Sequence, residues 1–326
     1  MKAKFWIGII ISIVFLYLFF RKVDFYELWR SLKGVNYFYI IPIIMLMPVM
    51  FFVRAERWRC LLIPIRNIGI PSLFSATVIG FAANNILPAR IGEIVRAYVI
   101  GRKENISKSS ALATIIVERF FDGLMVILFI LLIIAFPPFK EVEIIERLKG
   151  AALLLSGIFI GGVVAMIFLK YNTTVALEWA KFLFSPLPPR FSEKLLGILK
   201  SFAEGLGVIG KGGYIFLIFI YSIIIWFLAV LVAYILLPAF SLKGLPIMAV
   251  IFIQVAIAFG VSVPSAPGYV GTFHYACALG LGLLGVDSYT AKSFAIVMWA
   301  VSIIPVTVLG LFFLWRDNLS LREIKE

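Results

Sequence analysis

The hydrophobic positions of this chain fall into long runs that are almost free of charge. Six of these runs approach or exceed the roughly 20 residues with which a helix crosses a bilayer. No stretch alternates polar and apolar residues in the way that membrane strands do. The pattern therefore predicts an all-α polytopic membrane protein, a single integral membrane domain over residues 1–326, with full crossings at about 5–20, 37–53, 110–136, 151–169, 213–237 and 291–315.

Two further apolar segments, 72–100 and 246–284, carry Pro and Gly in their middle. Proline lacks the backbone donor and glycine weakens a helix, so we expect each segment to break at its centre. Non-helical backbone at membrane depth requires protein or a watery cavity around it. Each segment is therefore predicted to be a re-entrant helical hairpin whose tip lies at a site, with breaks at Pro88, Gly92, Pro264, Pro267, Gly268 and Gly271.

The two predicted hairpins resemble each other. Pro88-x-x-Ile91-Gly92 aligns with Pro267-x-x-Val270-Gly271 at an offset of 179, and the crossings that follow align at an offset of 180. The order of crossing, hairpin and crossing thus occurs in 37–136 and again in 213–315, joined by a cytoplasmic amphipathic linker at 170–212. By the distribution of basic residues, the first hairpin is expected to enter from the cytoplasm and the second from outside. Inverted repeats of this kind are typical of carriers that open one site alternately to each side. The alternative is that broken apolar helices resemble one another by composition alone.

The basic residues indicate the orientation of the crossings. With both termini in the cytoplasm, eighteen of the thirty Lys and Arg residues fall on the cytoplasmic side and nine on the outer side. Cytoplasmic segments carry such an excess, so both termini are predicted to be cytoplasmic, although four basic residues in 21–36 oppose this orientation. The net charge of +13 is therefore assigned to topology and anionic headgroups, and not to nucleic acid.

The composition excludes several other classes of protein. With 63% hydrophobic and 14% charged residues, the chain is far from the average of soluble domains. Cys60 and Cys277 have neither a pairing pattern nor metal-ligand spacing, and there is no phosphate-binding glycine loop, nucleophile elbow or Cys/His metal set. We expect no enzyme activity, no cofactor and no metal.

The polar residues of the first repeat are concentrated around its predicted break. Arg90, Glu93 and Arg96 follow one another at intervals of three and would share one helix face. The next crossing adds three charges and the hairpin adds two amides, so that three arginines and three carboxylates nearly balance. Charge at membrane depth is costly and usually faces a protein interior or an aqueous path. The predicted cluster comprises Asn84, Asn85, Arg90, Glu93, Arg96, Glu118, Arg119 and Asp122.

Two interpretations of this cluster remain open. Arginine presents a planar fork of donors that suits phosphate, so an anionic headgroup is its natural ligand. The alternative is that the arginines and carboxylates neutralise each other and hold helices together. The basic run from Arg54 to Arg59, at the cytoplasmic end of the second crossing, mixes Arg with Trp and is interpreted as a solvated interface anchor, with capture of a lipid headgroup as the second interpretation.

The second tip offers hydroxyl groups and the one histidine of the chain, but no acid and no arginine. A lone histidine is more often a hydrogen-bonded helix residue than a ligand or a proton relay, so both interpretations of that residue stay open. The tip offers Ser262 as a further hydroxyl group, and its candidate site residues are Ser265, Tyr269, Thr272 and His274.

Two motifs carry a resemblance to a known family. They are Asn84-Asn85-Ile86-Leu87-Pro88-Ala89-Arg90-Ile91-Gly92-Glu93, continued by Glu118-Arg119-x-x-Asp122, and Ala266-Pro267-Gly268-Tyr269-Val270-Gly271-Thr272-Phe273. Together they resemble the lysylphosphatidylglycerol synthetase transmembrane region, a flippase-like family of prokaryotic membrane proteins. In bifunctional members this region precedes an aminoacyltransferase and is credited with moving the aminoacylated phospholipid to the outer leaflet.

The resemblance implies the translocating part alone, because no aminoacyltransferase follows the last crossing here. It places Arg90, Glu93, Glu118, Arg119 and Asp122 at the polar positions of the first motif, and Pro267, Gly268 and Gly271 at those of the second. Many relatives carry a glutamate near the place of His274. Because this chain has histidine there, any role of that glutamate in binding a proton or cation is not inferred for this chain.

The leading hypothesis is a lipid translocase of a prokaryotic cytoplasmic membrane. It would move a phospholipid or polyprenyl-phosphate-linked lipid by alternating access at a polar cavity between the hairpins, with anionic lipids, and lipid- or glycan-synthesis enzymes, as partners. The alternatives are an ion-coupled carrier of a small anionic solute, and a non-transport subunit or enzyme of lipid or glycan assembly. Apolar lateral openings between helices would favour a lipid, whereas a closed aqueous vestibule would favour a solute.

Overall fold

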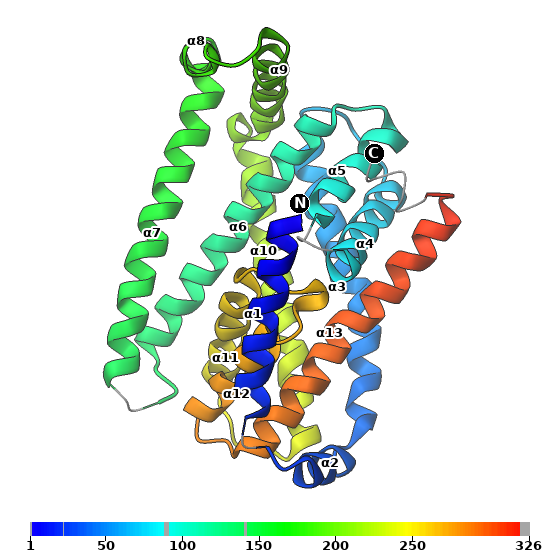
Figure 1. The fold of residues 1–326 in the computed structure, drawn as a ribbon, viewed down its shortest axis with the longest axis vertical. Coiled ribbons are helices and arrows are strands. Elements are labelled where there is room, and N and C mark those ends of the chain that lie inside the picture. The colour runs from blue at the N-terminus through cyan, green and yellow to red at the C-terminus, as the bar shows by residue number, and fades with distance from the viewer. Residues whose placement is uncertain (1, 22, 88–90, 140–141, 320–326) are drawn as a thin grey trace.

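The computed structural model describes residues 2–21, 23–87, 91–139 and 142–319. Within these ranges the chain is helical with short connections and contains no strand (Figure 1). The α-helices are α1 (Lys2–Phe20), α2 (Phe25–Lys33), α3 (Ile40–Leu62), α4 (Ile70–Ile86), α5 (Gly92–Glu104), α6 (Lys108–Ala135), α7 (Val142–Tyr171), α8 (Thr173–Phe184), α9 (Pro189–Gly205), α10 (Gly212–Leu236), α11 (Ile247–Ser262), α12 (Thr272–Leu283) and α13 (Ser288–Arg316).

Four helical segments of the described chain are long and apolar enough to cross a membrane. They are Tyr37–Leu62, Glu143–Tyr171, Gly212–Phe240 and Ser288–Arg316, and the bent pair of α1 and α2 would make a fifth. Helix α6 has the length of a crossing, but three charges interrupt its apolar sequence. The all-α membrane class is confirmed, while the count of six crossings and the side of the termini stay predictions.

Helices α4 and α5 pack against each other, as do α11 and α12. Figure 1 shows the first pair toward the end of the molecule that carries α8 and α9, and the second pair toward the end that carries α2. Helix α4 ends at Ile86 and α5 begins at Gly92, so Gly92 lies inside a helix; Pro88 and Arg90 lie outside the described residues. Pro264, Pro267, Gly268 and Gly271 all lie between α11 and α12.

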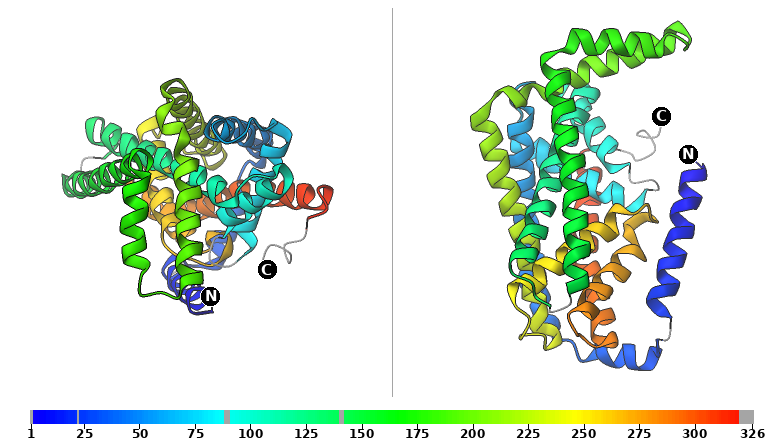
Figure 2. Two further views of the ribbon diagram at one scale, coloured as in Figure 1. Left: turned by 90° about the horizontal axis from the view of Figure 1, so that it is seen from above. Right: turned by 90° about the vertical axis from the view of Figure 1, so that its left-hand side faces the viewer.

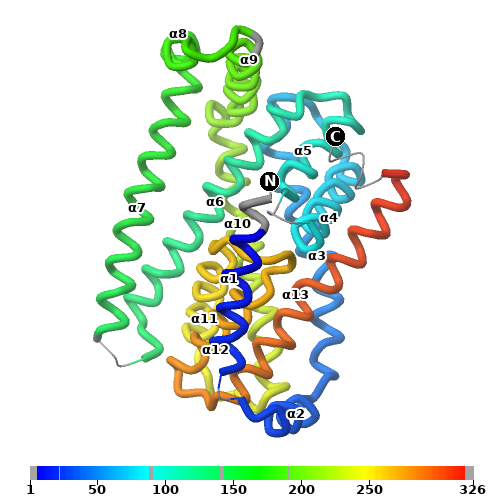
Figure 3. Tube along the Cα trace, viewed as in Figure 1, coloured from blue at the N-terminus to red at the C-terminus, as the bar shows by residue number. Residues whose placement is uncertain are grey.

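The tip between α11 and α12 is held by two other helices. Gly268 and Gly271 adopt positive φ angles of 68° and 90°, which glycine tolerates without a steric penalty. Trp299 of α13 donates a hydrogen bond from Nε1 to the Gly268 carbonyl oxygen at 2.6 Å. Ser12 of α1 accepts one from the Ala266 amide at 2.7 Å. Because α1 packs along α12, this tip is fixed from two sides (Figure 3).

Helix α7 lies on the outside of the bundle and packs mainly against α6. Most of its length is poorly buried, which suits a helix that faces lipid. Helices α8 and α9 follow and project beyond the bundle at one end (Figure 2). The predicted linker at 170–212 thus contains α8, α9 and a 3₁₀ turn at Leu206–Gly210.

A polar contact ties the end of α13 to the first hairpin, and it predicts a loss of stability in acid. Asp317 accepts hydrogen bonds from Lys103 Nζ at 2.6 Å and from the Ser75 hydroxyl. Burial would raise the pKa of Asp317, but these hydrogen bonds and the Lys103 charge outweigh it and hold the pKa below its ordinary value. The pair therefore stabilises the fold at neutral pH, and this contribution is lost as the pH falls through the lowered pKa.

We expect Asp317→Asn to lower the free energy of unfolding at neutral pH and to have little effect in acid. Unfolding in detergent micelles, followed at several pH values, measures this difference. Lys103→Gln should cause a similar loss, and the double variant should lose little more because both changes remove one interaction. A constant difference between wild type and Asp317→Asn at every pH would contradict the assignment.

Candidate functional site

Glu118 of α6 is the centre of a buried ionic network. Its side chain is fully buried, and its Oε1 lies 3.0 Å from Arg57 Nη2, from Arg96 Nη1 and from Arg119 Nη2. A buried carboxylate is stable only when it is paired and hydrogen-bonded. Three guanidinium groups, from α3, α5 and α6, satisfy that requirement here.

Asp122 lies one helical turn further along α6 and shares two of these arginines. Arg57 Nη1 donates to Asp122 Oδ1 at 2.8 Å, and Arg119 Nη1 lies 3.1 Å from Oδ2. Arg57 Nη1 also donates to the Ser222 hydroxyl of α10 at 2.9 Å. The network therefore joins both halves of the chain, because α3 and α6 belong to the first predicted repeat and α10 to the second.

Arg54 and Arg57 were not among the predicted site residues, and the interpretation of this run as a solvated anchor is wrong for both. The second interpretation, capture of a headgroup, stays a prediction. Arg57 has 0% exposure. The Arg54 guanidinium lies 5.0 Å from the centre of the Phe81 ring, a cation–π distance, and has no carboxylate within ion-pair distance among the described residues. Helix α3 continues to Leu62, so these residues enter the bundle. Arg59 behaves as predicted, with 40% of its side chain exposed.

These two arginines change the charge of the site. The sequence predicted a balance of three arginines and three carboxylates. Within the described residues, the site instead contains more arginines than carboxylates. Glu93 accepts a hydrogen bond from Asn84, and among the described residues only two carboxylates form ion pairs with these arginines. The arginines are Arg54, Arg57, Arg96 and Arg119, and the carboxylates are Glu118 and Asp122.

A cavity of about 470 Å³ lies beside this network and is called here the central cavity. Arg54, Arg119 and Asp122 are its charged lining residues, which leaves one surplus positive charge. Most of the remaining lining is apolar or aromatic and comes from α3, α4, α6, α10, α11 and α13. Such a surface, with a few convergent charges, is typical of a ligand site.

The first predicted hairpin contributes Phe81 and one polar residue, Asn85, to the lining of the central cavity. Asn85 lines it and donates from Nδ2 to the Thr307 hydroxyl of α13 at 2.8 Å. Asn84 instead closes the hairpin, because its Oδ1 accepts from the Gly92 amide at 2.7 Å and its Nδ2 donates to Glu93 at 3.3 Å. Arg96 is buried against Trp58 and Glu118. In the predicted stripe of Arg90, Glu93 and Arg96, the two described residues, Glu93 and Arg96, therefore contact different partners and do not form one surface.

The second predicted hairpin contributes Tyr269, which lines the central cavity. Ser265, Thr272 and His274 are buried and do not line it. His274 packs among aromatic rings, with its ring centre 5.2 Å from that of Trp299 and 5.6 Å from that of Phe19. The structure thus brings one of the four candidate residues of this tip to the cavity, together with Ser262.

Sequence reasoning also missed three polar residues of the second half of the chain. Trp226 and Gln254 line the central cavity, and Trp226 donates to Asp122 Oδ1 at 3.4 Å. Ser222 completes the contacts of Arg57. Their spacing of four residues, 222 and 226, places the two α10 residues on one helix face, and this was the available signal.

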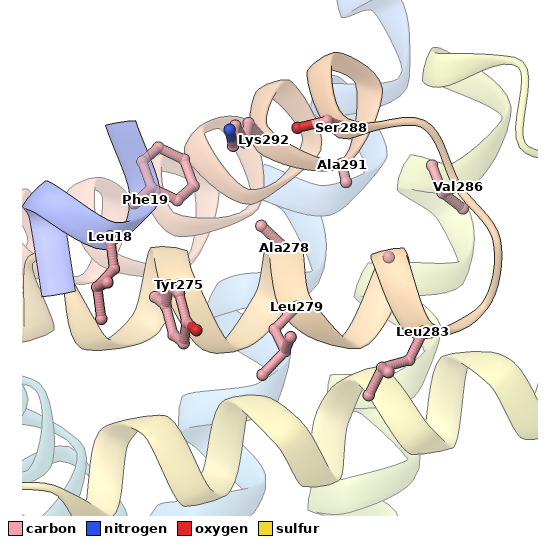
Figure 4. Close-up of a pocket in the computed structure, with 11 residues that line it drawn as sticks. Leu18, Phe19, Tyr275, Ala278, Leu279, Leu283, Val286, Ser288, Ala291 and Lys292 are labelled. Carbon is pink, nitrogen blue, oxygen red and sulfur yellow. The ribbon is translucent and has the colours of Figure 1, made fainter. Parts of the chain in front are cut away.

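A second pocket, of about 290 Å³, lies between α1, α12 and α13 and shares no lining residue with the central cavity. Figure 4 shows Tyr275, Leu279 and Leu283 of α12 on one side of it and Lys292 of α13 on another. No group of three or more His, Cys, Asp or Glu that could hold a metal occurs in the described part of the chain. Lys292 is the one charged lining residue of the second pocket, whereas three charged residues line the central cavity.

Comparison with known proteins agrees with the motifs at this site. The chain is 26% identical over 247 residues to a UPF0104 membrane protein of Methanocaldococcus jannaschii, covering 74% of this chain and 97% of that protein. It is 25% identical over 286 residues to a UPF0104 membrane protein of Pyrococcus horikoshii, covering 83% and 85%. No solved structure matches the chain. Residues 5–310 match the family described as the lysylphosphatidylglycerol synthase TM region, and the chain belongs to that family of membrane proteins.

Proposed function

We propose that this protein is a lipid translocase that moves a lipid with an anionic headgroup between the two leaflets of its membrane. The observation that carries the proposal is the central cavity, in which Arg54 and Arg119 face a largely apolar interior between the two helix pairs. A guanidinium group binds phosphate through paired N–H donors. With Asp122 as the one acidic lining residue, the cavity has the charge that an anionic headgroup requires.

Arg119 is suited to bind and release a ligand. It pairs with Glu118 and Asp122, yet 42% of its side chain is exposed. When the cavity is empty, the two carboxylates satisfy the guanidinium group. A phosphate can approach its exposed face while Arg57 continues to neutralise both carboxylates. Headgroup binding therefore exchanges one set of charge-assisted hydrogen bonds for another and does not leave a buried charge unpaired.

The proposed transport follows alternating access. The pairs α4–α5 and α11–α12 lie toward opposite ends of the bundle, and each follows a long helix and precedes another. An inverted repeat of this form would let the two halves rock about a fixed midplane site. The cavity is bounded by Asn85 of the first pair and Tyr269 of the second, so that relative motion of the tips would open it to one side at a time.

The same proposal includes the setting of the protein. It would act in the cytoplasmic membrane of a prokaryote, without catalysing a covalent step, on a phospholipid or a polyprenyl-phosphate-linked lipid. Enzymes that synthesise lipids or glycans would supply its substrate. A small anionic solute is less well matched, because the cavity lining is largely apolar, whereas a hydrated solute requires polar contacts on most of its surface.

Arg119→Ala tests the proposal in reconstituted vesicles. Wild-type protein is expected to exchange fluorescent phospholipid or polyprenyl-phosphate lipid between leaflets faster than empty vesicles do. The variant is expected to lose on the order of tenfold or more of this rate, because it removes a charge-assisted contact worth about 1.5–3 kcal/mol. Its fold should persist, since Glu118 keeps Arg57 and Arg96, and Asp122 keeps Arg57.

Arg147→Ala is the matched control. Arg147 of α7 makes the same type of ion pair, with Glu143 at 2.7 Å, but 79% of its side chain is exposed and it lies outside the cavity. Exchange should be unchanged in this variant. If none of these lipids crosses wild-type vesicles faster than empty ones, the translocase proposal fails.

A further inference from the structure

The central cavity continues sideways into a groove between α6 and α7. A neighbouring cavity of about 220 Å³ is lined by α6 and α7, and it shares Arg119 and Gly123 with the central cavity. These two residues follow one another at an interval of four on α6, so they lie on one helix face. The passage between the two cavities therefore has a cation at one edge and a residue without a side chain at the other.

The groove extends in both directions from this passage. The cavity of 220 Å³ reaches Ile127 and Leu155, toward the loop that joins α6 to α7. A further cavity of about 270 Å³ begins at Phe120 and Phe159, which line both, and reaches Met166 near the other end of α7. The two rings lie 6.0 Å apart between their centres. The line of cavities thus follows α6 and α7 on both sides of the level of Arg119.

The chemistry of the groove differs from that of the central cavity. Arg119 is the one charged residue that lines either groove cavity, and the remaining lining residues are apolar or glycine. Helix α7, which forms the outer wall, is mostly exposed and long enough to cross a membrane. A charged chamber joined to an apolar groove at the membrane face matches a molecule with an anionic head and a hydrocarbon tail.

We propose that the α6–α7 groove holds an acyl chain of a phospholipid whose phosphate lies at Arg119 in the central cavity, with the chain passing over Gly123. This inference rests on the proposed function for its ligand class, but it concerns where the lipid is bound and not whether it is moved. The groove gives the chain room toward either end of the bundle. A tail can therefore reorient along α6 while its headgroup stays at the arginines.

Gly123 offers a way to close the passage without disturbing the fold. A Cβ atom placed on Gly123 would meet no other atom within 4 Å, so a larger side chain can be accommodated there at the expense of the open space. Gly157 of α7 has the same free surroundings and lines none of these cavities. Gly123→Leu and Gly157→Leu therefore form a matched pair that differs in whether the passage is filled.

Photocrosslinking of an acyl chain tests this arrangement. Purified wild-type protein is placed in phosphatidylcholine vesicles that contain a trace of phosphatidylglycerol with a photoreactive group within one chain, or diacylglycerol with the same chains. Adducts are mapped on Phe120 and Phe159, and Val308 of α13, which is 62% exposed, reports contact with bulk lipid. Leaflet exchange is measured on the same preparations.

We expect adducts in the groove, normalised to those at Val308, to be enriched about tenfold for phosphatidylglycerol over diacylglycerol, since only the former carries a phosphate for Arg119. Gly123→Leu should remove this enrichment and Gly157→Leu should retain it. Equal labelling by both probes, enrichment that survives Gly123→Leu, or an absence of groove adducts would each overturn the inference. Phosphate-dependent adducts without leaflet exchange would uphold the binding geometry and refute the translocase function.

Discussion

Arg57→Ala is expected to lower the free energy of unfolding by about 3–5 kcal/mol, the cost of breaking a buried ion pair by removing one partner. Arg57 has no exposed surface and contacts Glu118, Asp122 and Ser222 within 3.0 Å. Alanine would leave a cavity among these groups. Two carboxylates would then rely on Arg96 and Arg119 alone.

The loss is measured by unfolding in detergent micelles. Arg59→Ala, two residues away on the same helix, is the control, because Arg59 is 40% exposed and its nearest carboxylate atom lies 3.9 Å away. A surface pair of this kind contributes about 0–1 kcal/mol. Adding Asp122→Asn to Arg57→Ala should restore part of the stability, because it removes one of the carboxylates left without its partner. Equal effects of Arg57→Ala and Arg59→Ala would show that the network does not stabilise the fold.

The sequence predicted the two carboxylates of this network, together with Arg96 and Arg119, but it did not predict Arg57. Glu118, Arg119 and Asp122 interrupt an apolar run, so their position at membrane depth could be recognised from the run itself. Arg54 and Arg57 follow the apolar run 37–53 at its end, where basic residues and Trp usually mark a membrane interface. The burial of Arg57 depends on α6 and α10, which cover this part of α3.

A finer signal was nevertheless present in that run. Arg54, Arg57 and Trp58 lie at intervals of three and four on one face of α3, and Glu56 and Arg59 lie on another. The first face is buried or lines the central cavity, and the second retains exposed side chains. Helical periodicity within a charged segment thus separated interior arginines from interface arginines, where the charge count alone did not.

The break between α11 and α12 was predictable, whereas most of the inward-facing residues of the second tip were not. Pro and Gly are local constraints, and the break between α11 and α12 falls at the residues that the sequence indicated. Which side chain faces the cavity depends on the rotation of each helix against its neighbours. Tyr269 faces it from a backbone with φ of 58°, whereas His274 on α12 turns toward Phe19 and Trp299. No pattern in the sequence of the tip specifies that rotation.

Gly92→Ala is expected to destabilise the first hairpin and to abolish lipid exchange. A Cβ atom on Gly92 would lie 2.1 Å from the Gly80 carbonyl oxygen and 2.5 Å from Asn84 Oδ1. The first contact is to backbone, which cannot turn aside, so α5 would have to move away from α4. Overpacking of this kind costs about 3 kcal/mol. The hydrogen bond from the Gly92 amide to Asn84, which closes the hairpin, would be strained at the same time.

The consequence for function follows from the position of Arg96, one turn along α5 from Gly92. A displaced α5 would carry Arg96 away from Glu118, which it contacts at 3.0 Å. Glu118 would then draw more strongly on Arg119, the residue proposed to bind the headgroup. Unfolding in micelles and exchange in vesicles measure the two effects separately, with Gly161→Ala as the control.

Gly161 of α7 would carry its Cβ into open space, with no atom within 4 Å, so alanine there should be neutral or more stable by up to about 1 kcal/mol, the difference in helix propensity. If Gly92→Ala were as stable and as active as Gly161→Ala, the close packing of α4 against α5 at Gly92 and Gly80 would be contradicted. The network at Glu118 would then have to be held by α3 and α6 without the support of the hairpin.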